Sequence, residues 1–351
     1  MAADSSQAAG GPAPYTDLTP GGVLDALDAV GLQGDGRLIQ LNSYENRVFQ
    51  VFLEGGRVVV AKFYRPGRWS DAQILEEHAF ATELVQGEIP VAAPIALALD
   101  ARSPHVGAVG SAGATLARLS TEAGAVYRFG VTERLAGRAP ELEDPEVRRW
   151  LGRYLGRLHA VGAVAPFAHR MTLDVASYGE ASSEFLLARH LVSDDVADRW
   201  RGLAQQALAV CRDAFAAAAP RRIRLHGDCH PGNILWNEAG PHFVDLDDAV
   251  SGPAVQDLWM LLSGDDATAR WQLHALLKGY EDFMDFDDAE LALIEPLRAL
   301  RLIHHSAWIA RRWNDPAFPV AFPWFGGSNY WQQQTRLLDE QLATLQRDTT
   351  S

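Results

Sequence analysis

Cysteine is scarce in this chain: its 351 residues include only Cys211 and Cys229. Two cysteines are too few for a disulfide framework, and their positions do not make a zinc pattern. Basic residues are also few, since 31 Lys and Arg stand against 45 Asp and Glu, which gives a net charge of −14. Because nucleic acids are bound by clustered Lys and Arg, we do not expect nucleic acid as the main partner.

Long apolar runs are absent too. None approaches the roughly 20 residues of a membrane span, so no membrane partner is expected. The N-terminus is small, polar and rich in Pro and Gly, with no basic start and no apolar core. This composition predicts a disordered tail over residues 1–16 rather than a signal peptide. With so few cysteines, a reducing cytoplasm is the expected location.

The first part of the chain alternates like β-structure. It has a helical pattern from Leu18 to Val30, and a capping-box pattern at Ser70 opens a second helix that runs to about Gln86. Further strand-like sequence continues to Thr132. Glu54-Gly55-Gly56 predicts a hairpin turn between two of the strands. The predicted early strands are Arg37–Leu41, Asn46–Leu53 and Arg57–Tyr64.

Helical patterns dominate after Gly137. The sequence therefore predicts an α+β chain with two lobes: a small β-rich N-lobe over residues 17–133 and a larger, mainly helical C-lobe over residues 134–351. The predicted helices of the C-lobe are Pro145–Val161, Glu180–Leu191, Ala197–Ala219, Pro253–Leu262, Ala267–Phe283 and Ala289–Trp313.

One stretch of the C-lobe departs from this pattern, LHGDCHPGNILWNEAGPHFVDLDD from Leu225 to Asp248. It places Asp228 five positions before Asn233, and the short β-like run before Asp245 ends on that second acid. An acidic turn rich in Asp, Pro, Gly and Asn explains the composition, but not an acid placed after a strand. Phosphoryl transfer from Mg-ATP requires such parts: a carboxylate that orients a hydroxyl, and oxygen ligands for Mg²⁺.

The motif assigns roles to these residues. Asp228 is the candidate catalytic base, in the spacing of the kinase H-R-D-x-x-x-x-N loop with Gly in place of Arg. Asn233 and Asp245 are the candidate Mg²⁺ ligands, and through the metal Asp245 serves the catalytic step. Neighbouring carboxylates repel one another unless a cation or hydrogen bonds offset the repulsion, which favours a metal. Asp247 is the alternative ligand.

A lysine interrupts the apolar run VVVAKFY at Lys62, where kinases have their V-A-I-K lysine. The alternative is a lysine on the exposed face of a strand. A glutamate on the next helix is the expected partner, and the apolar stripe of that helix favours Glu77 over Glu76. The loop between Leu41 and Arg47 occupies the place of a phosphate-covering loop, although it has no glycine. Ser43 and backbone amides could contact phosphates there, and an ordinary hairpin turn remains open.

Four further polar residues are expected to support the structure. Asp257, at the start of a helix, could hydrogen-bond to the backbone of the loop that carries Asp228. His159 and His226 are expected to satisfy internal hydrogen bonds rather than bind a metal. Cys229 is interpreted as a small buried thiol rather than a redox group.

These parts, in this order, resemble the aminoglycoside phosphotransferase superfamily, which has a protein-kinase-like fold. Longer strings are similar to the bacterial stress response kinase A group, the RdoA-like serine/threonine protein kinases, over about Thr19 to Leu338. The strings are LNSYENRVFQV, KFYRPGRWSDAQILEEH, RLHGDCHPGNILW, FVDLDDAVSGPAVQDLWMLL, IEPLRALRLIHH and DPAFPVAFPWF.

The resemblance implies a cytoplasmic, ATP-dependent enzyme of the stress response that transfers the γ-phosphate to Ser or Thr of proteins, with Mg²⁺ as its metal. It implies Asp228 as proton acceptor and Asn233 with Asp245 as metal ligands. A monomer is expected.

The resemblance also implies the ATP contacts. Ser43 would contact ATP, and Lys62 with Glu77 would orient the α- and β-phosphates. Residues 132–135 would form the adenine hinge, with Glu133 and Leu135 as its binding residues.

Two other functions stay open at this point. A small-molecule kinase of the same superfamily, acting on an amino alcohol, a sugar or an aminoglycoside, would use the same chemistry, because the fold does not choose the acceptor. A nucleotide-binding regulator without turnover is the third alternative.

Overall fold

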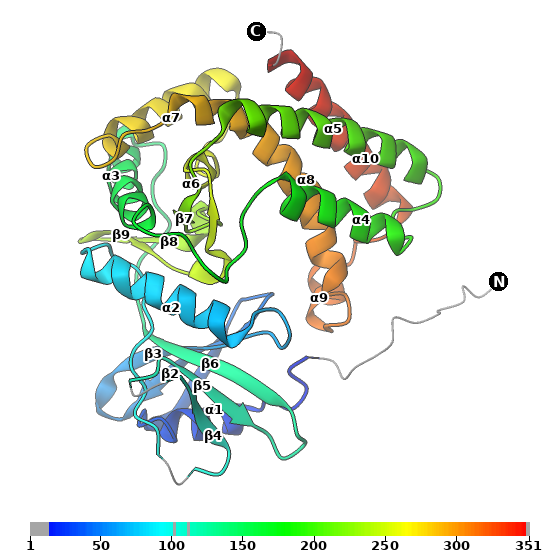
Figure 1. Ribbon diagram of the computed structural model, residues 1–351. Helices are drawn as coiled ribbons and strands as arrows, with labels where there is room; N and C mark the ends of the chain where they lie inside the picture. Colours follow the sequence, from blue (N-terminus) through cyan, green and yellow to red (C-terminus); the bar gives the residue numbers. More distant parts are fainter. Residues whose placement is uncertain (1–13, 101–102, 111–112, 349–351) are drawn as a thin grey trace, which may run out of the picture. The chain divides into compact units, whose positions relative to one another are not determined.

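The computed structural model describes residues 14–100, 103–110 and 113–348, and the chain divides into two compact units (Figure 1). One unit is β-rich and the other mainly helical, which confirms the predicted α+β class. Each unit is built from three separate segments. The smaller unit contains Met1–Asp71, Pro94–Arg134 and Arg311–Phe325, and the larger unit contains Ala72–Ala93, Leu135–Ala310 and Gly326–Ser351.

A six-stranded antiparallel sheet forms the smaller unit, in the order β1-β2-β3-β6-β5-β4. The predicted turn between β2 and β3 is present as a short 3₁₀ turn over Glu54–Gly56. The strands are β1 (Gly34–Leu41), β2 (Arg47–Leu53), β3 (Val58–Phe63), β4 (Val106–Val109), β5 (Leu116–Ser120) and β6 (Val126–Glu133).

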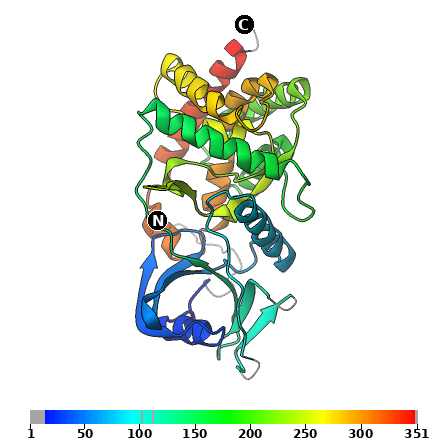
Figure 2. The ribbon, with the colours of Figure 1, turned by 90° about the vertical axis from the view of Figure 1, so that its left-hand side faces the viewer.

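The core of the smaller unit lies between this sheet and the helix α1 (Pro20–Asp28). Along β3 burial alternates with the period of two that a strand imposes, so Val59, Ala61 and Phe63 are buried while Lys62 lies on the opposite face. The sheet curves over α1 in Figure 2. From α1 the core receives Val23, Ala26 and Leu27.

Helices form most of the larger unit, together with two short two-stranded sheets, β7 with β10 and β8 with β9. Its helices are α2 (Asp71–Gln86, of which Asp71 counts with the smaller unit), α3 (Pro145–Gly162), α4 (Ala181–Ala188), α5 (Ala197–Ala218), α6 (Val255–Trp259), α7 (Asp266–Tyr280), α8 (Ile294–Arg311) and α10 (Ser328–Asp348). The strands are β7 (Ile223–Leu225), β8 (Ile234–Asn237), β9 (Gly240–Phe243) and β10 (Val250–Gly252).

The two units differ from the contiguous lobes 17–133 and 134–351 in two segments. Helix α2 belongs with the larger unit because Phe80 and Leu84 on its apolar face are fully buried in that unit's core, beside residues of α3 such as Leu155. The segment Arg311–Phe325, which contains α9 (Ala317–Ala321), belongs with the smaller unit because its buried Asp315 accepts hydrogen bonds there.

Some predicted helices have different limits. The predicted helix from Ala289 to Trp313 is a 3₁₀ turn over Asp288–Leu293 followed by α8, and α6 is shorter than the predicted Pro253–Leu262. A π-helical turn over Val175–Glu180 precedes α4. The helices α9 and α10 were not predicted.

The prediction of a disordered tail over residues 1–16 is wrong for the last of these residues. Residues 1–13 lie outside the described residues, but Tyr15 is buried and stacks on Tyr127 with ring centroids 5.7 Å apart. Its hydroxyl donates to the carbonyl oxygen of Phe63 at 3.1 Å. The ordered chain of the smaller unit therefore begins before Asp17.

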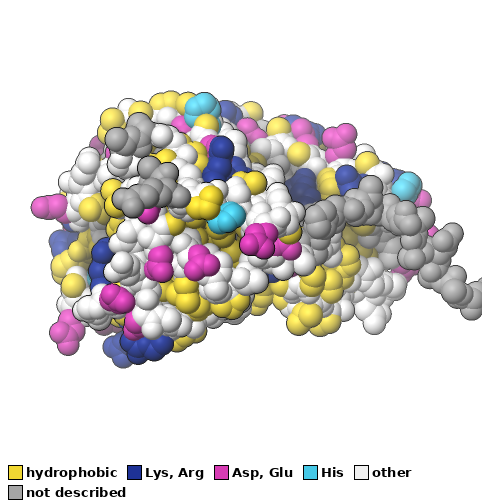
Figure 3. Space-filling model, turned by 90° about the horizontal axis from the view of Figure 1, so that it is seen from below, with side chains coloured by type: hydrophobic (Ala, Val, Ile, Leu, Met, Phe, Trp, Pro, Cys, Tyr) yellow, Lys and Arg dark blue, Asp and Glu magenta, His cyan; other side chains and the backbone are white. Residues whose placement is uncertain are grey.

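Within the part of the chain that the structure describes, no helix is both long enough and apolar enough to cross a membrane. On the face seen in Figure 3, Lys and Arg side chains are scattered in small groups among acidic and hydrophobic ones.

Candidate active site

The loop that carries Asp228 is fixed by a buried carboxylate. Asp257 in α6 accepts hydrogen bonds from the backbone N–H groups of His226 and Gly227, both at 2.8 Å, as the sequence predicted. Burial by itself raises the pKa of Asp257, but the hydrogen bond from His159 and the backbone N–H groups outweigh it and hold this pKa below its usual value. The carboxylate is thus kept charged, and it holds the loop at the end of β7.

The two histidines are internal hydrogen-bonding groups, which confirms their predicted role. His159 in α3 contacts Asp257 through Nε2 at 3.1 Å and the hydroxyl of Tyr280 through Nδ1 at 3.0 Å. Nε2 of His226 lies 2.9 Å from the carbonyl oxygen of Val244. This contact ties the Asp228 loop to the segment that leads into Asp245.

Glycine at position 227 is required by geometry. Its φ is +85°, and a Cβ atom there would lie 2.1 Å from the carbonyl oxygen of Asp248. Only glycine takes such a conformation without strain and allows this approach. The Gly in place of the kinase Arg is therefore a consequence of backbone packing.

Asn233 and Asp245 flank the hairpin of β8 and β9, because Asn233 directly precedes β8 and Asp245 follows β9. Ile234 pairs with Phe243, and the Val244 N–H donates to the carbonyl oxygen of Asn233 at 3.0 Å. The side-chain amide of Asn233 donates to the carbonyl oxygen of Asp228, also at 3.0 Å. The structure therefore brings the three predicted catalytic and metal-binding residues together within the larger unit.

Asp245 differs from the alternative ligand, Asp247, in its exposure. Its φ and ψ are both +61°, a left-handed conformation that Asp tolerates better than most residues, and the residue is exposed. The alternative ligand, Asp247, is only 2% exposed. Exposure thus favours Asp245 as the residue that reaches a ligand.

The residues present fit the expected Mg²⁺. Asn233 uses its amide nitrogen in the hydrogen bond to Asp228, so its amide oxygen and the Asp245 carboxylate form a pair of oxygen donors. Mg²⁺ is commonly held by one or two protein carboxyl or amide groups together with substrate phosphates.

Two side chains that the sequence did not indicate flank Asp228. Arg301 of α8 donates through Nη1 to Oδ1 of Asp228 at 3.0 Å, and Nε2 of His230 lies 3.5 Å from Oδ2. The carboxylate is about one quarter exposed. Arg301 is one of many arginines on amphipathic helices, so no local signal in the sequence marks it.

The remaining predicted residues of the larger unit lie on α2 and directly after β6. Glu77 is buried and lies 3.5 Å from Nη2 of Arg170. Its competitor Glu76 accepts hydrogen bonds from three successive backbone N–H groups, those of residues 168–170. Glu76 is thus engaged with a loop of its own unit. Leu135, the first residue of the larger unit after β6, is half-buried.

Three predicted ATP contacts lie in the smaller unit. Lys62 is half-buried on β3, with Nζ 5.8 Å from the ring centroid of Tyr64. The Ser43 hydroxyl accepts from the Asn46 N–H at 3.4 Å. Glu133 ends β6, and its half-exposed carboxylate pairs with Arg57. Lys62 belongs to the smaller unit and Glu77 to the larger one, and their pairing stays a prediction.

Comparison with known proteins gives the same family as the motifs. Residues 37–294 match the phosphotransferase enzyme family. Stress response kinase A of Escherichia coli (strain K12) is 44% identical over 338 residues, which cover 95% of each chain. The serine/threonine protein kinase RdoA of Salmonella typhimurium (strain LT2) is 44% identical over 346 residues, which cover 94% of each chain.

Solved structures share the fold at low identity. Amicoumacin kinase hAmiN, in complex with AMP-PNP, Ca²⁺ and Ami, has a TM-score of 0.66 at 20% identity and covers 92% of both chains. The microcompartment-associated aminopropanol kinase has a TM-score of 0.66 at 17% identity over 92% of this chain and 97% of its own. The chain is therefore a phosphate-transferring enzyme that belongs to the phosphotransferase enzyme family, in the group of the stress response kinase A proteins.

Proposed function

We propose that this enzyme transfers the γ-phosphate of ATP to serine or threonine hydroxyl groups of proteins. The observation that carries the proposal is the arrangement around Asp228: a partly exposed carboxylate on a loop pinned by Asp257, beside the Asn233–Asp245 pair. The acceptor class is supported by the relative named as a serine/threonine protein kinase, which matches nearly the whole chain.

In this proposal Asp228 orients the acceptor hydroxyl and takes its proton on a carboxylate oxygen late in the transfer. Arg301 lies 3.0 Å from Oδ1 of Asp228 and His230 lies 3.5 Å from Oδ2, so we assign Oδ2, the less closely held oxygen, to the hydroxyl. Asn233 and Asp245 would hold Mg²⁺, which when bound neutralises charge on the phosphates. Catalysis by this chain is then mainly positioning and charge stabilisation.

The proposal also includes the ATP contacts predicted from the sequence. Lys62, with Glu77, would orient the α- and β-phosphates, Ser43 and its loop would cover them, and Glu133 and Leu135 would lie in the adenine hinge. Because the carboxylate of Glu133 pairs with Arg57, its backbone is the part available to adenine. The requirement for ATP and the two free, buried cysteines support a cytoplasmic location.

The test is γ-phosphate transfer from Mg-ATP to generic protein acceptors, with wild type compared with Asp228→Ala. We expect label on protein Ser or Thr in the wild type, none in Asp228→Ala, and nearly unchanged nucleotide binding in the variant. If purified Asp228→Ala kept wild-type turnover, Asp228 would not be the base. ADP formation without labelled protein would favour the small-molecule alternative, and ATP binding without any turnover would favour a regulator.

A further inference from the structure

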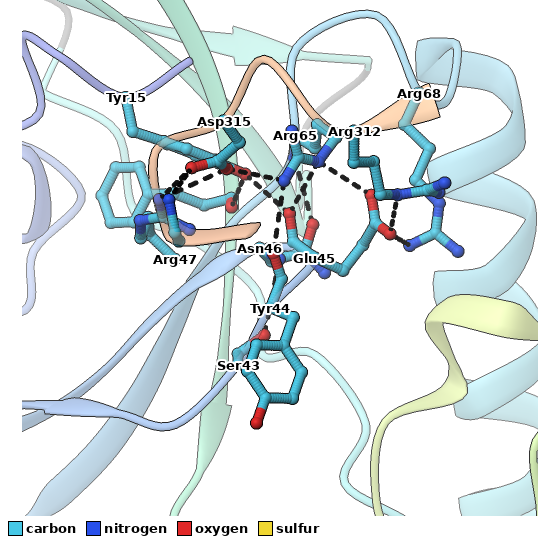
Figure 4. A network of polar contacts seen from close by, with 12 residues as sticks. Tyr15, Ser43, Tyr44, Glu45, Asn46, Arg47, Arg65, Arg68, Arg312 and Asp315 are labelled. Atoms are coloured by element: carbon cyan, nitrogen blue, oxygen red, sulfur yellow. Dashed lines mark hydrogen bonds and ion pairs between the residues drawn. The ribbon is translucent and has the colours of Figure 1, made fainter. Parts of the chain in front are cut away.

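The loop proposed to cover the phosphates is held by a network of buried charges within the smaller unit (Figure 4). The network joins the β1–β2 loop (Asn42–Asn46) to the segment Arg311–Phe325, two parts of the chain some 270 residues apart. It consists of two carboxylates and four guanidinium groups. These belong to Glu45 and Asp315, and to Arg47, Arg65, Arg68 and Arg312.

Asp315 is the anchor of the network. Its side chain is completely buried, and its carboxylate accepts from Nη2 of Arg65 at 2.7 Å and from Nη2 of Arg47 at 3.1 Å. It also accepts from the backbone N–H of Ala317 at 3.0 Å, which fixes the turn that begins α9. A buried carboxylate is tolerated only when it is fully paired and hydrogen-bonded in this way.

Arg65 connects Asp315 to the loop. Its guanidinium donates to the carbonyl oxygens of Tyr44 and Glu45, at 3.2 and 3.1 Å, and Nε lies 2.9 Å from the Glu45 carboxylate. Its backbone N–H donates to the side-chain oxygen of Asn46 at 3.1 Å. The planar, five-donor guanidinium suits such a task, because it binds several acceptors in fixed directions at once.

The far side of the loop is held as well. The Glu45 carboxylate pairs with Arg312 and lies 3.6 Å from Nη1 of Arg68, while the Tyr15 hydroxyl donates to the Glu45 carbonyl oxygen at 3.3 Å. Burial lowers the pKa of Arg312 to about 10, which leaves it protonated at neutral pH. Every residue from Tyr44 to Asn46 is therefore bound by a residue from outside the loop.

Such a network is a costly way to gain stability, because desolvation offsets most of the attraction between buried ions. What it supplies is a fixed geometry. A binding loop that is already ordered loses less conformational entropy when its ligand binds, so the ligand binds more tightly. A loop without glycine, ordered by arginines, is thus an alternative to a flexible glycine-rich cover.

We propose that Asp315, acting through Arg65 and Arg47, is a positioning residue that holds the β1–β2 loop in the conformation in which Ser43 and its neighbours contact the ATP phosphates. The inference rests on the proposed function, since it assumes that this loop meets ATP. It gives the segment Arg311–Phe325 a role in nucleotide binding that its place in the sequence does not suggest.

The experiment compares wild type, Asp315→Asn and a matched control, Asp35→Asn, for their affinity for Mg-ATP and for adenosine. Asp35 is in the same unit and pairs only with Arg37 at the surface in the described structure. Because Asn lacks the charge that holds Arg65 and Arg47, we expect Asp315→Asn to bind ATP about ten-fold more weakly. Adenosine, which has no phosphates, should bind equally well to all three proteins.

Hydrogen exchange of peptides that cover Asn42–Asn46 supplies a second readout, and exchange there should be faster in Asp315→Asn. Faster exchange with unchanged ATP affinity, or an equal loss of ATP and adenosine affinity, would overturn the inference. Should Asp315→Asn fail to fold, Arg312→Gln is the second variant, because it removes only one partner of Glu45 and should also weaken ATP binding. Unchanged ATP affinity in Arg312→Gln would overturn the inference as well. A wild type that binds no ATP would refute the proposed function itself.

Discussion

Asp257 shows how one buried residue can set the position of a catalytic group that it does not touch. Its two carboxylate oxygens receive the N–H groups of residues 226 and 227, which directly precede Asp228. The residue is completely buried, so its charge is stable only because His159 and these N–H groups surround it. A buried, hydrogen-bonded carboxylate can thus fix the position of a neighbouring carboxylate that is partly exposed.

Glu290 is the buried carboxylate that should make stability depend on pH. Its side chain accepts from the backbone N–H of Val255, the first residue of α6, at 2.9 Å. Burial raises the pKa of Glu290 to about 7 from a usual value near 4.5. Because the folded pKa exceeds the unfolded one, the folded state binds more protons between these values, and stability falls as pH rises from about 4.5 through 7.

We therefore expect Glu290→Gln to unfold with a weaker pH dependence than wild type. At pH 5 the two should be similar, while at pH 8 the variant should be more stable by up to about 3 kcal/mol, because the amide oxygen can still accept from Val255 without carrying a charge. Denaturant unfolding at several pH values measures this, with the exposed Glu238→Gln as control. A variant whose stability tracks wild type across this pH range would contradict the assignment.

At the scale of elements, the packing of α3 against α7 depends on glycine. A Cβ atom on Gly152 would lie 1.9 Å from the carbonyl oxygen of Leu276, and one on Gly279 would lie 2.0 Å from the carbonyl oxygen of Arg149. Small residues let two helix backbones approach this closely. The two helices bury Leu155, Leu158 and Leu276 in the main core of the larger unit.

Gly152→Ala should therefore destabilise the enzyme, by about 1–3 kcal/mol, because the added methyl group must push the helices apart. Gly202→Ala in α5 is the matched control, since nothing lies within 4 Å of its Cβ position. There the higher helix propensity of Ala should stabilise the protein by up to about 1 kcal/mol. Thermal or denaturant unfolding measures the stability of both variants, and stability changes of the same sign in the two would refute the packing argument.

Elements defined by local periodicity could be predicted from the sequence, and elements defined by distant partners could not. The strands β2 and β3 and the helices α3 and α5 lie within a residue or two of their predicted limits, because their apolar periods are regular. The helix α10 is also amphipathic, but it was not among the predicted helices.

The residues of the candidate site likewise fall into those that a local motif reveals and those that it does not. Asp228, Asn233 and Asp245 could be found because one hairpin brings them together within 18 residues. Arg301 and Asp315 could not, because each reaches its partner across 73 or more positions of the sequence through an ion pair that no local pattern encodes.

For the whole molecule, the two units are interleaved in sequence rather than consecutive. The chain leaves the smaller unit after Asp71 and Arg134 and returns to it at Pro94 and Arg311. A fragment of residues 17–133 would lack Asp315, so Arg47 and Arg65 would lose their buried partner. Phosphate binding and catalytic chemistry are therefore expected to require the intact chain.

Binding of Mg-ATP should raise the free energy of unfolding of the enzyme. A ligand that binds only the folded state stabilises it by about 2.7 kcal/mol at one hundred times its Kd. We expect Mg²⁺ to increase the ATP-dependent rise in Tm of wild type, and Asp245→Asn to lose this Mg²⁺-dependent increment while it keeps the part due to ATP alone. Asn also tolerates the left-handed backbone at this position, so the substitution removes charge without straining the turn.

The matched control is Asp213→Asn, an exposed aspartate on α5 of the same unit, which should respond to Mg-ATP like wild type. Each protein is compared with its own ATP-free Tm, so a change in basal stability does not affect the result. Equal Mg²⁺-dependent increments in Asp245→Asn and wild type would exclude Asp245 as a metal ligand. The buried Asp247 would then be the next carboxylate to test, because it is the neighbouring acid that the motif itself leaves open.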